Sequence, residues 1–215
     1  TLGKLDMGEI TRDEALAHAE VIVSATSLPD SGDFENGYGD DPDYVADTIR
    51  FAAEAGLAGC SMEDTNMAAH SAYDFDLAVE RVHAAAAAAR ALNKDFVFVA
   101  RADGVMNGVY DMDEAIRRIQ AFDKAGADCL YVPMPPSMED VARVCQATPN
   151  PVNAIAAGKY AKVSRDEFAA IGVGRISLGS ALSKVTHAAL LKAAKGILND
   201  GDISELLNGA SSEVV

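Results

Sequence analysis

Residues 55–64 of the chain read Ala-Gly-Leu-Ala-Gly-Cys-Ser-Met-Glu-Asp. An amphipathic segment ends just before Gly56, and glycine accepts the left-handed conformation that closes a helix. A short apolar run follows and leads to two acids. The stretch therefore predicts a helix end, a buried strand over 58–62, and two carboxylates, Glu63 and Asp64, at the carboxyl end of that strand.

The same order of helix, glycine and short apolar run recurs along the chain, as at Lys124-Ala125-Gly126 and Ala170-Ile171-Gly172. Helices that alternate with short buried strands imply βαβ units and a parallel sheet. The amphipathic segments predict helices over 11–26, 41–55, 74–92, 113–125, 137–147, 164–171 and 180–199. The apolar runs predict strands over 28–34, 58–62, 96–101, 128–133, 151–156 and 174–179.

These elements favour an α/β fold of the (β/α)₈ TIM-barrel type, with residues 1–215 in a single domain. A closed eight-stranded barrel takes about 250 residues, whereas this chain has 215, about six strands, and a helix at its start. We therefore expect the N-terminal strands to be missing from this chain. An open doubly wound sheet is the competing architecture, but it usually carries a Gly-rich phosphate turn such as GxGxxG, and none is present.

The charge of the chain argues against two classes of partner. Lys and Arg total 18 against 33 Asp and Glu, which gives a net charge of −15. This sign repels phosphate backbones and anionic lipid surfaces, so we expect neither nucleic acid nor membrane as a partner. No stretch approaches the ~20 apolar residues that span a bilayer. The three cysteines have no metal-type spacing and indicate a reduced, cytoplasmic protein.

Acids gather at the predicted carboxyl ends of three successive strands, where barrel enzymes carry their active sites. A carboxylate cluster is costly unless a cation neutralises it, and oxygen ligands favour Mg²⁺ or Mn²⁺. Arg101 adds a planar fork that suits a carboxylate or phosphonate. The alternative is a set of solvated loop acids. The residues are Asp33 and Glu35, then Glu63 and Asp64, and then Asp103 beside Arg101.

Several weaker signals lie at or beyond other strand ends. Gly37, in Asn36-Gly37-Tyr38-Gly39, indicates either a flexible turn or close backbone approach to a ligand. Asn153 ends a later strand and is a candidate substrate contact. His70 lies in 65–73, a stretch with the length of a lid, and an imidazole is a side chain suited to proton transfer near neutral pH. Gly179-Ser180 precedes a helix and suits either a phosphate or an ordinary N-cap.

The segments at 33–39, 55–64 and 99–103, continued by 125–128 and 172–179, resemble the isocitrate lyase and phosphoenolpyruvate mutase superfamily. The likeness is greatest to its short, mutase-like (phosphonomutase-type) bacterial members. It implies a (β/α)₈ barrel of the phosphoenolpyruvate/pyruvate type, often tetrameric, with C-terminal helices exchanged between subunits. It also implies Mg²⁺-dependent cleavage or rearrangement of a C–C or C–P bond in a small 2-oxo or 2-hydroxy acid, through a metal-stabilised enolate.

Position by position, the resemblance assigns roles to the acids and the arginine. Asp33, Glu35 and Glu63 would hold the metal directly or through water, and Arg101 would clamp the acid group of the substrate. Asp6 matches a family acid near the site.

The chain also departs from the family pattern. The substrate-binding Ser-Gly segment of the family would precede Thr1. The stretch 65–70 has neither the Cys of the lyases nor the Lys of the mutase, and Pro133 stands where the mutase has a His. Asp30 is an acid at a strand position where an apolar residue is expected. The loop without the lyase Cys speaks against isocitrate-type cleavage, and the missing Lys and Pro133 speak against the C–P rearrangement. The substrate and the bond stay open.

Two other functions remain in view. One is a barrel that binds a small acid without turnover, and the other is a phosphate-binding barrel isomerase that uses Gly179-Ser180. We also expect a homo-oligomer, a dimer or tetramer, because the helix from Ser180 and the tail over 199–215 carry leucines beyond a finished barrel.

Overall fold

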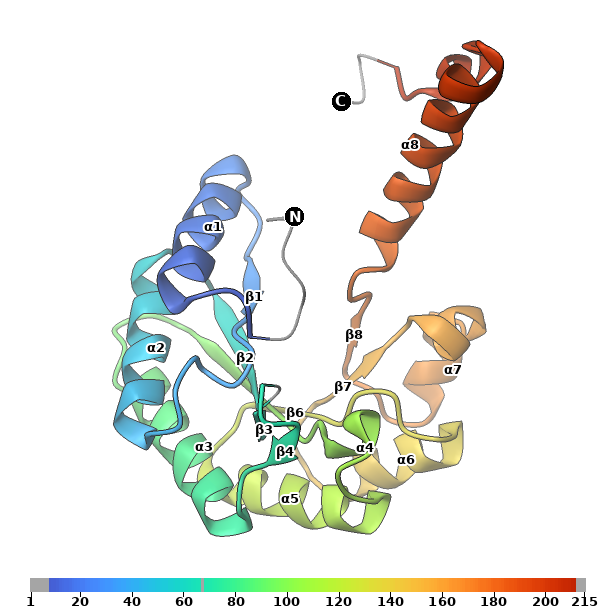
Figure 1. The fold of residues 1–215 in the computed structure, drawn as a ribbon. Coiled ribbons are helices and arrows are strands. Elements are labelled where there is room, and N and C mark those ends of the chain that lie inside the picture. Colours follow the sequence, from blue (N-terminus) through green and yellow to red (C-terminus); the bar gives the residue numbers. More distant parts are fainter. Residues whose placement is uncertain (1–7, 67, 212–215) are drawn as a thin grey trace. The chain divides into compact units, whose positions relative to one another are not determined.

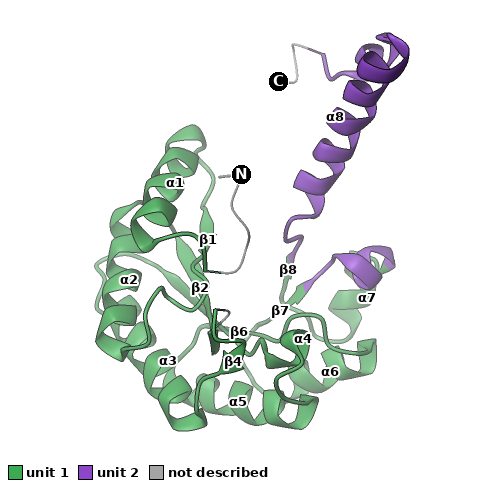
Figure 2. Ribbon diagram, in the orientation of Figure 1, with its two compact units in different colours: residues 1–154, 163–176 green, residues 155–162, 177–215 purple. Residues whose placement is uncertain are grey.

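The computed structural model of the chain describes residues 8–66 and 68–211. The chain divides into two compact units. The first comprises Thr1–Ala154 and Val163–Ile176, and the second comprises Ile155–Lys162 and Ser177–Val215 (Figure 2).

The main sheet has six strands in the order β1-β2-β5-β6-β7-β8, so strands that follow one another in the chain are neighbours in space (Figure 1). The pairs from β1 through β7 are parallel. This arrangement confirms the predicted α/β fold, and each strand lies within its predicted range except β2, which ends at Glu63, one residue past the predicted 58–62. The strands are β1 (Ser31–Asp33), β2 (Gly59–Glu63), β5 (Val97–Arg101), β6 (Cys129–Tyr131), β7 (Val152–Ile155) and β8 (Arg175–Ser177).

Helices connect the strands, and the seven longer helices begin and end within two residues of their predicted bounds. They are α1 (Arg12–Ala25), α2 (Pro42–Glu54), α3 (Phe75–Arg90), α5 (Met112–Ala125), α6 (Met138–Gln146), α7 (Arg165–Ala170) and α8 (Ala181–Asp200). The short elements were not predicted, because two to five residues leave no periodic pattern. These are β3 (Thr65–Asn66), β4 (Ser71–Ala72), α4 (Gly104–Asn107), η1 (Gly158–Lys162) and η2 (Ser204–Asn208).

The core of the first unit lies between the sheet and the helices that pack on it. Ile49 of α2, Phe98 of β5 and Phe122 of α5 are fully buried there. Strand β2 runs close to β5 because Gly59 has no side chain: a Cβ at this position would lie 2.5 Å from the carbonyl oxygen of Val97. This packing fixes the two strands that carry Glu63 and Arg101 at their carboxyl ends.

The predicted glycine closures are present at the three helix-to-strand joints. Each glycine has the positive φ that side chains avoid, and each follows the last residues of a helix. The residues are Gly56 with φ 97°, Gly126 with φ 104° and Gly172 with φ 95°.

The second unit contains η1, α8 and η2. Helix α8 buries none of its residues, and Lys192 of α8 pairs with Glu205 of η2 at 2.8 Å. Ser180 stands at the N-cap of α8 but makes no side-chain capping bond, so ordinary capping does not explain its position. Across the described part of the chain, no helix has the length and apolar character that a membrane crossing needs.

Candidate active site

The carboxyl ends of β1, β2 and β5 lie side by side at one edge of the sheet. Asp33 is in register with Ser61, and Glu63 is in register with Arg101. Backbone pairing continues past the strands, because the Glu63 N–H donates to the Glu35 carbonyl at 2.9 Å. The acids that the sequence placed at three strand ends therefore come together with Arg101.

Arg101 is the centre of this cluster, and its side chain is only 10% exposed. Its Nη1 lies 2.6 Å from Asp33 Oδ2, and its Nη2 lies 3.0 Å from Glu63 Oε2. Asp103 binds the guanidinium in a fork, with Nε at 3.0 Å and Nη2 at 2.5 Å. One cation thus joins the ends of three strands.

The cluster carries more negative than positive charge. Arg101 contacts three carboxyl groups, those of Asp33, Glu63 and Asp103, so two negative charges are in excess when all three are ionised. Burial first, and then repulsion from Asp103, raises the pKa of Glu63 to about 8 despite the attraction of Arg101. Burial also raises the pKa of Asp103. Burial alone would lower the pKa of Arg101, but the carboxylates hold it well above its usual range. The site therefore favours a proton or a further cation.

Glu35 belongs to a strained loop between β1 and α2. It has φ 44°, and Tyr38 has φ 65°, values that are uncommon for residues with a side chain. The Glu35 N–H donates to Asp33 Oδ1 at 3.2 Å. Such strain persists where surrounding contacts enforce it, and it is concentrated at functional sites.

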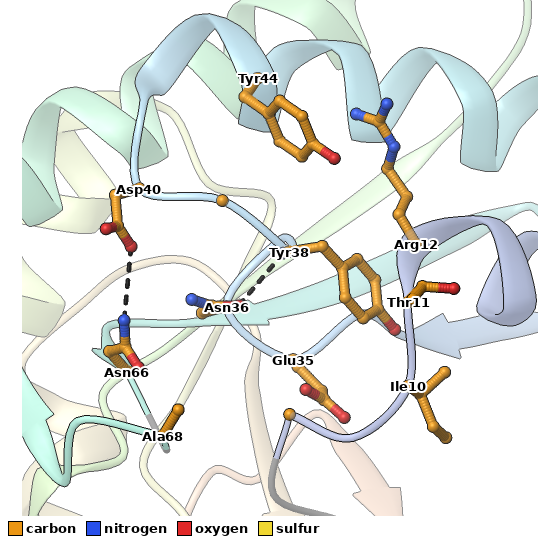
Figure 3. A pocket seen from close by; sticks show the side chains of 12 residues that line it. Ile10, Thr11, Arg12, Glu35, Asn36, Tyr38, Asp40, Tyr44, Asn66 and Ala68 are labelled. Atoms are coloured by element: carbon orange, nitrogen blue, oxygen red, sulfur yellow. Dashed lines mark hydrogen bonds between the residues drawn. The ribbon is translucent and has the colours of Figure 1, made fainter.

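Glu35 also lines a cavity of about 480 Å³ beside this loop. Figure 3 shows its carboxylate there with the side chains of Tyr38, Asn66 and Arg12. A second cavity, of about 390 Å³, is lined by Glu35, Asp33 and Asp30 among others. The carboxylates of Asp33 and Glu35 thus both line cavities. The Asp33 side chain is 63% exposed.

A metal would find suitable donors here, although not a finished cage. Within residues 8–66 and 68–211, no three His, Cys, Asp or Glu side chains converge as a preformed metal site. Mg²⁺ usually keeps several waters and takes one or two carboxylates. Oxygen donors on Asp33, Glu35 and Glu63, together with the excess negative charge, fit an ion of that kind.

The stretch after Glu63 forms a small antiparallel hairpin, because β3 pairs with β4. Thr65 ties its base to the site by donating to Glu63 Oε1 at 3.2 Å. Asn66 and Tyr73 donate to Asp40 Oδ1 at 3.4 Å and 2.6 Å, which joins the hairpin to the loop after Glu35. His70 is exposed at the turn with φ 49°. Its contact with substrate stays a prediction.

The remaining predicted residues lie in different surroundings. Asn153 is buried on β7 and accepts from Arg175 Nη1 at 3.1 Å. Gly37 is buried too: its N–H donates to the Phe34 carbonyl at 2.7 Å, and its own carbonyl accepts from Thr48 at 3.0 Å. Substrate contact by either remains a prediction. Asp6 lies outside the described residues.

Asp64 differs sharply from its neighbour Glu63. It accepts from the Asp103 N–H at 2.9 Å, from the Tyr110 hydroxyl at 2.7 Å and from Arg118 Nη1 at 3.0 Å. Burial raises its pKa to about 6, and these hydrogen bonds oppose the rise. Asp64 is thus a supporting residue of the site. Arg118 was missed in the sequence because Asp64 lies 54 positions away along the chain.

The phosphoenolpyruvate phosphomutase family model matches residues 1–198. The chain belongs to this family. A similar fold is found in the crystal structure of a lyase/mutase from Burkholderia cenocepacia J2315. The TM-score is 0.91 and the sequence identity is 41%, over 96% of this chain and 74% of that one. The match confirms the barrel-type fold and the resemblance seen in the sequence.

Two curated relatives are lyases. The 2,3-dimethylmalate lyase of Eubacterium barkeri is 28% identical over 80% of this chain and 61% of its own length. The 2-methylisocitrate lyase of Escherichia coli (strain K12) is 34% identical over 61% of this chain and 45% of its own length. The chain therefore spans about half of these relatives.

The raised pKa of Glu63 predicts a pH-dependent stability. Between pH 4.5 and about 8, the folded protein holds a proton that the unfolded chain has released. The contribution of Glu63 to stability is therefore greatest below pH 4.5 and is lost as the pH rises toward 8. Glu63→Gln cannot ionise, so it should flatten the fall of Tm between pH 5 and 8, measured in EDTA. Glu139→Gln, at an exposed helix position, should keep the wild-type slope. Parallel profiles for wild type and Glu63→Gln would refute the assignment.

Proposed function

We propose that this protein is a Mg²⁺-dependent enzyme of the isocitrate lyase and phosphoenolpyruvate mutase type. Its substrate is a small 2-oxo or 2-hydroxy acid, in which it cleaves or rearranges a C–C or C–P bond. The supporting observation is the cluster at the ends of β1, β2 and β5, where three carboxylates surround one guanidinium. The names of the lyase relatives support the substrate class.

In this proposal the acids and the arginine divide the work. Asp33, Glu35 and Glu63 hold Mg²⁺, or Mn²⁺, directly or through water. The ion supplies positive charge where the substrate develops negative charge. Arg101 binds the acid group of the substrate, and Asp103 fixes the plane of the guanidinium through its fork. An arginine held in this way loses little freedom when a substrate binds.

The hairpin is the proposed lid. Thr65 anchors its base on Glu63, so movement of the turn can bring His70 toward the site while the metal ligand stays in place. His70 is then a candidate for proton transfer, because imidazole titrates near neutrality. Asn153 and Gly37 are weaker proposals for substrate contact, because both are already bonded within the protein.

The activity is tested by product formation from a panel of small acids. Purified protein should convert at least one of 2,3-dimethylmalate, 2-methylisocitrate, oxaloacetate and phosphonopyruvate into pyruvate, oxalate or phosphoenolpyruvate, in the presence of Mg²⁺ and not of EDTA, and faster than Mg²⁺ does without protein. Arg101→Lys keeps the charge but loses the fork, so kcat/KM should fall about 100-fold. Arg143→Lys, at an exposed ion pair, is the control and should keep wild-type activity. Binding of these acids without any turnover would favour a non-catalytic small-acid-binding barrel.

We also infer a homo-oligomer in the cytoplasm. The free cysteines Cys60, Cys129 and Cys145 suit a reducing compartment. Helix α8 and the tail after it expose an apolar surface that suits a second copy of the chain. Its residues are Leu182, Val185, Leu190, Leu191, Leu198, Ile203, Leu206 and Leu207, each 57% exposed or more.

Sedimentation tests the oligomer. The wild type should sediment as a dimer or larger assembly, because an apolar surface of this extent is stable only when covered. Leu190→Asp combined with Leu191→Asp should give a monomer with an unchanged circular dichroism spectrum. Lys195→Asp, which adds negative charge at an exposed position of the same helix, is the control for charge alone. A wild type that is monomeric at every concentration would contradict the proposal.

A further inference from the structure

We propose that Arg81 of α3 is a positioning residue that holds Glu35 in its place at the metal site. The inference rests on the proposed function, because it gives Glu35 the role of a metal ligand. It concerns a buried side chain that does not itself touch the cluster around Arg101.

Arg81 is 2% exposed and is the largest fully buried side chain of the described residues. Its guanidinium binds backbone carbonyls of the loop that follows Glu35. Nη1 donates to Gly39 at 2.5 Å and to Asp40 at 2.7 Å, and Nη2 donates to Asn36. One rigid group thus fixes the loop at both of its ends, starting at the residue after Glu35.

The loop needs such a clamp because its backbone is strained. Glu35, Gly37 and Tyr38 all have positive φ, and two of them carry side chains that disfavour this conformation. Released from Arg81, the loop would relax toward ordinary backbone angles, and the Glu35 carboxylate would move with it. Strained residues persist only when neighbouring contacts over-determine them.

Arg81 also connects this loop to the hairpin that follows Glu63. Its guanidinium stacks on the ring of Tyr73, 4.1 Å from the centroid. The Tyr73 hydroxyl accepts from Asn36 Nδ2 at 2.7 Å and donates to Asp40 Oδ1 at 2.6 Å. The loop and the end of the hairpin are therefore held by one buried cation, which places the two sides of the proposed site relative to each other.

The chemistry of these contacts requires arginine. A planar fork can reach several carbonyls and stack on a ring at the same time, whereas a lysine ammonium cannot. The charge is buried among carbonyl oxygens, so replacing the group leaves carbonyls without donors. The sequence carries one sign of this role: Arg81 interrupts the apolar face of α3 between the buried residues Ala78 and Ala85.

Mg²⁺ affinity separates positioning from general stability. Calorimetric titration of the full chain should give Arg81→Met a Kd for Mg²⁺ about tenfold above wild type, with a smaller increase for Arg81→Lys. Ile119→Ala removes a fully buried side chain of α5, a helix outside the loop and the hairpin, and lowers Tm while every residue of the clamp is kept. Its Kd should stay within about twofold of wild type. If Arg81→Met does not fold, Arg81→Lys carries the comparison.

Hydrogen exchange provides the second measurement. The backbone amides of residues 36–40 should exchange at least tenfold faster in the Arg81 variants than in wild type. In Ile119→Ala their exchange rates should equal those of wild type. The inference would be overturned if the Arg81 variants bound Mg²⁺ with the Kd of wild type. It would also be overturned if Ile119→Ala raised the Kd as much as the Arg81 variants do. If wild type binds no Mg²⁺, the proposed metal site is wrong, and the exchange rates alone decide whether Arg81 holds the loop. Exchange rates in the Arg81 variants equal to those of wild type would then show that Arg81 does not hold it.

Discussion

The contacts of Arg101 with three carboxylates are the interaction on which the rest of the site depends. The guanidinium reaches Asp33 on β1, Glu63 on β2 and Asp103 just beyond its own strand. These contacts bring three parallel strand ends to one point. They also leave negative charge in excess at a largely buried place, which is costly unless a cation or proton offsets it. The excess negative charge accounts for the demand for a cation, whereas the attraction for an anionic substrate comes from Arg101 and from that cation once it is bound.

Neighbouring acids at this edge have different roles because their surroundings differ. Asp64 is saturated by the Asp103 backbone, Tyr110 and Arg118, and so it stabilises the frame. Glu63 contacts Arg101, and Asp33 is largely open to solvent. Around them, Arg81 and Tyr73 hold the strained loop of Glu35. The site is therefore a small set of available carboxylates supported by a larger set of buried polar contacts.

Much of this arrangement was predictable from local patterns in the sequence. Helix periodicity, closing glycines and apolar runs located the long helices and the six strands, because each of these signals is contained within a few residues. The acids at the strand ends followed from the same reasoning, since parallel strands end at one edge. The order of Asp33, Glu63 and Arg101 around the edge then follows from sequential strand pairing.

What the sequence did not reveal depends on contacts between distant residues. Arg81 binds carbonyls more than 40 residues away, and Arg118 reaches Asp64 over 54 positions. Neither partner can be found from spacing along the chain. The hairpin at 65–72 was too short to leave a pattern in the sequence. The need for glycine at position 37 can be explained by packing and backbone hydrogen bonds, without a ligand.

The most direct test of the metal centre is anomalous diffraction from crystals soaked in Mn²⁺, which scatters strongly and takes oxygen ligands as Mg²⁺ does. The account predicts the strongest anomalous peak between the carboxylates of Asp33, Glu35 and Glu63, bonded to them directly or through water. A strongest peak at any other place, with none beside these three residues, would contradict it.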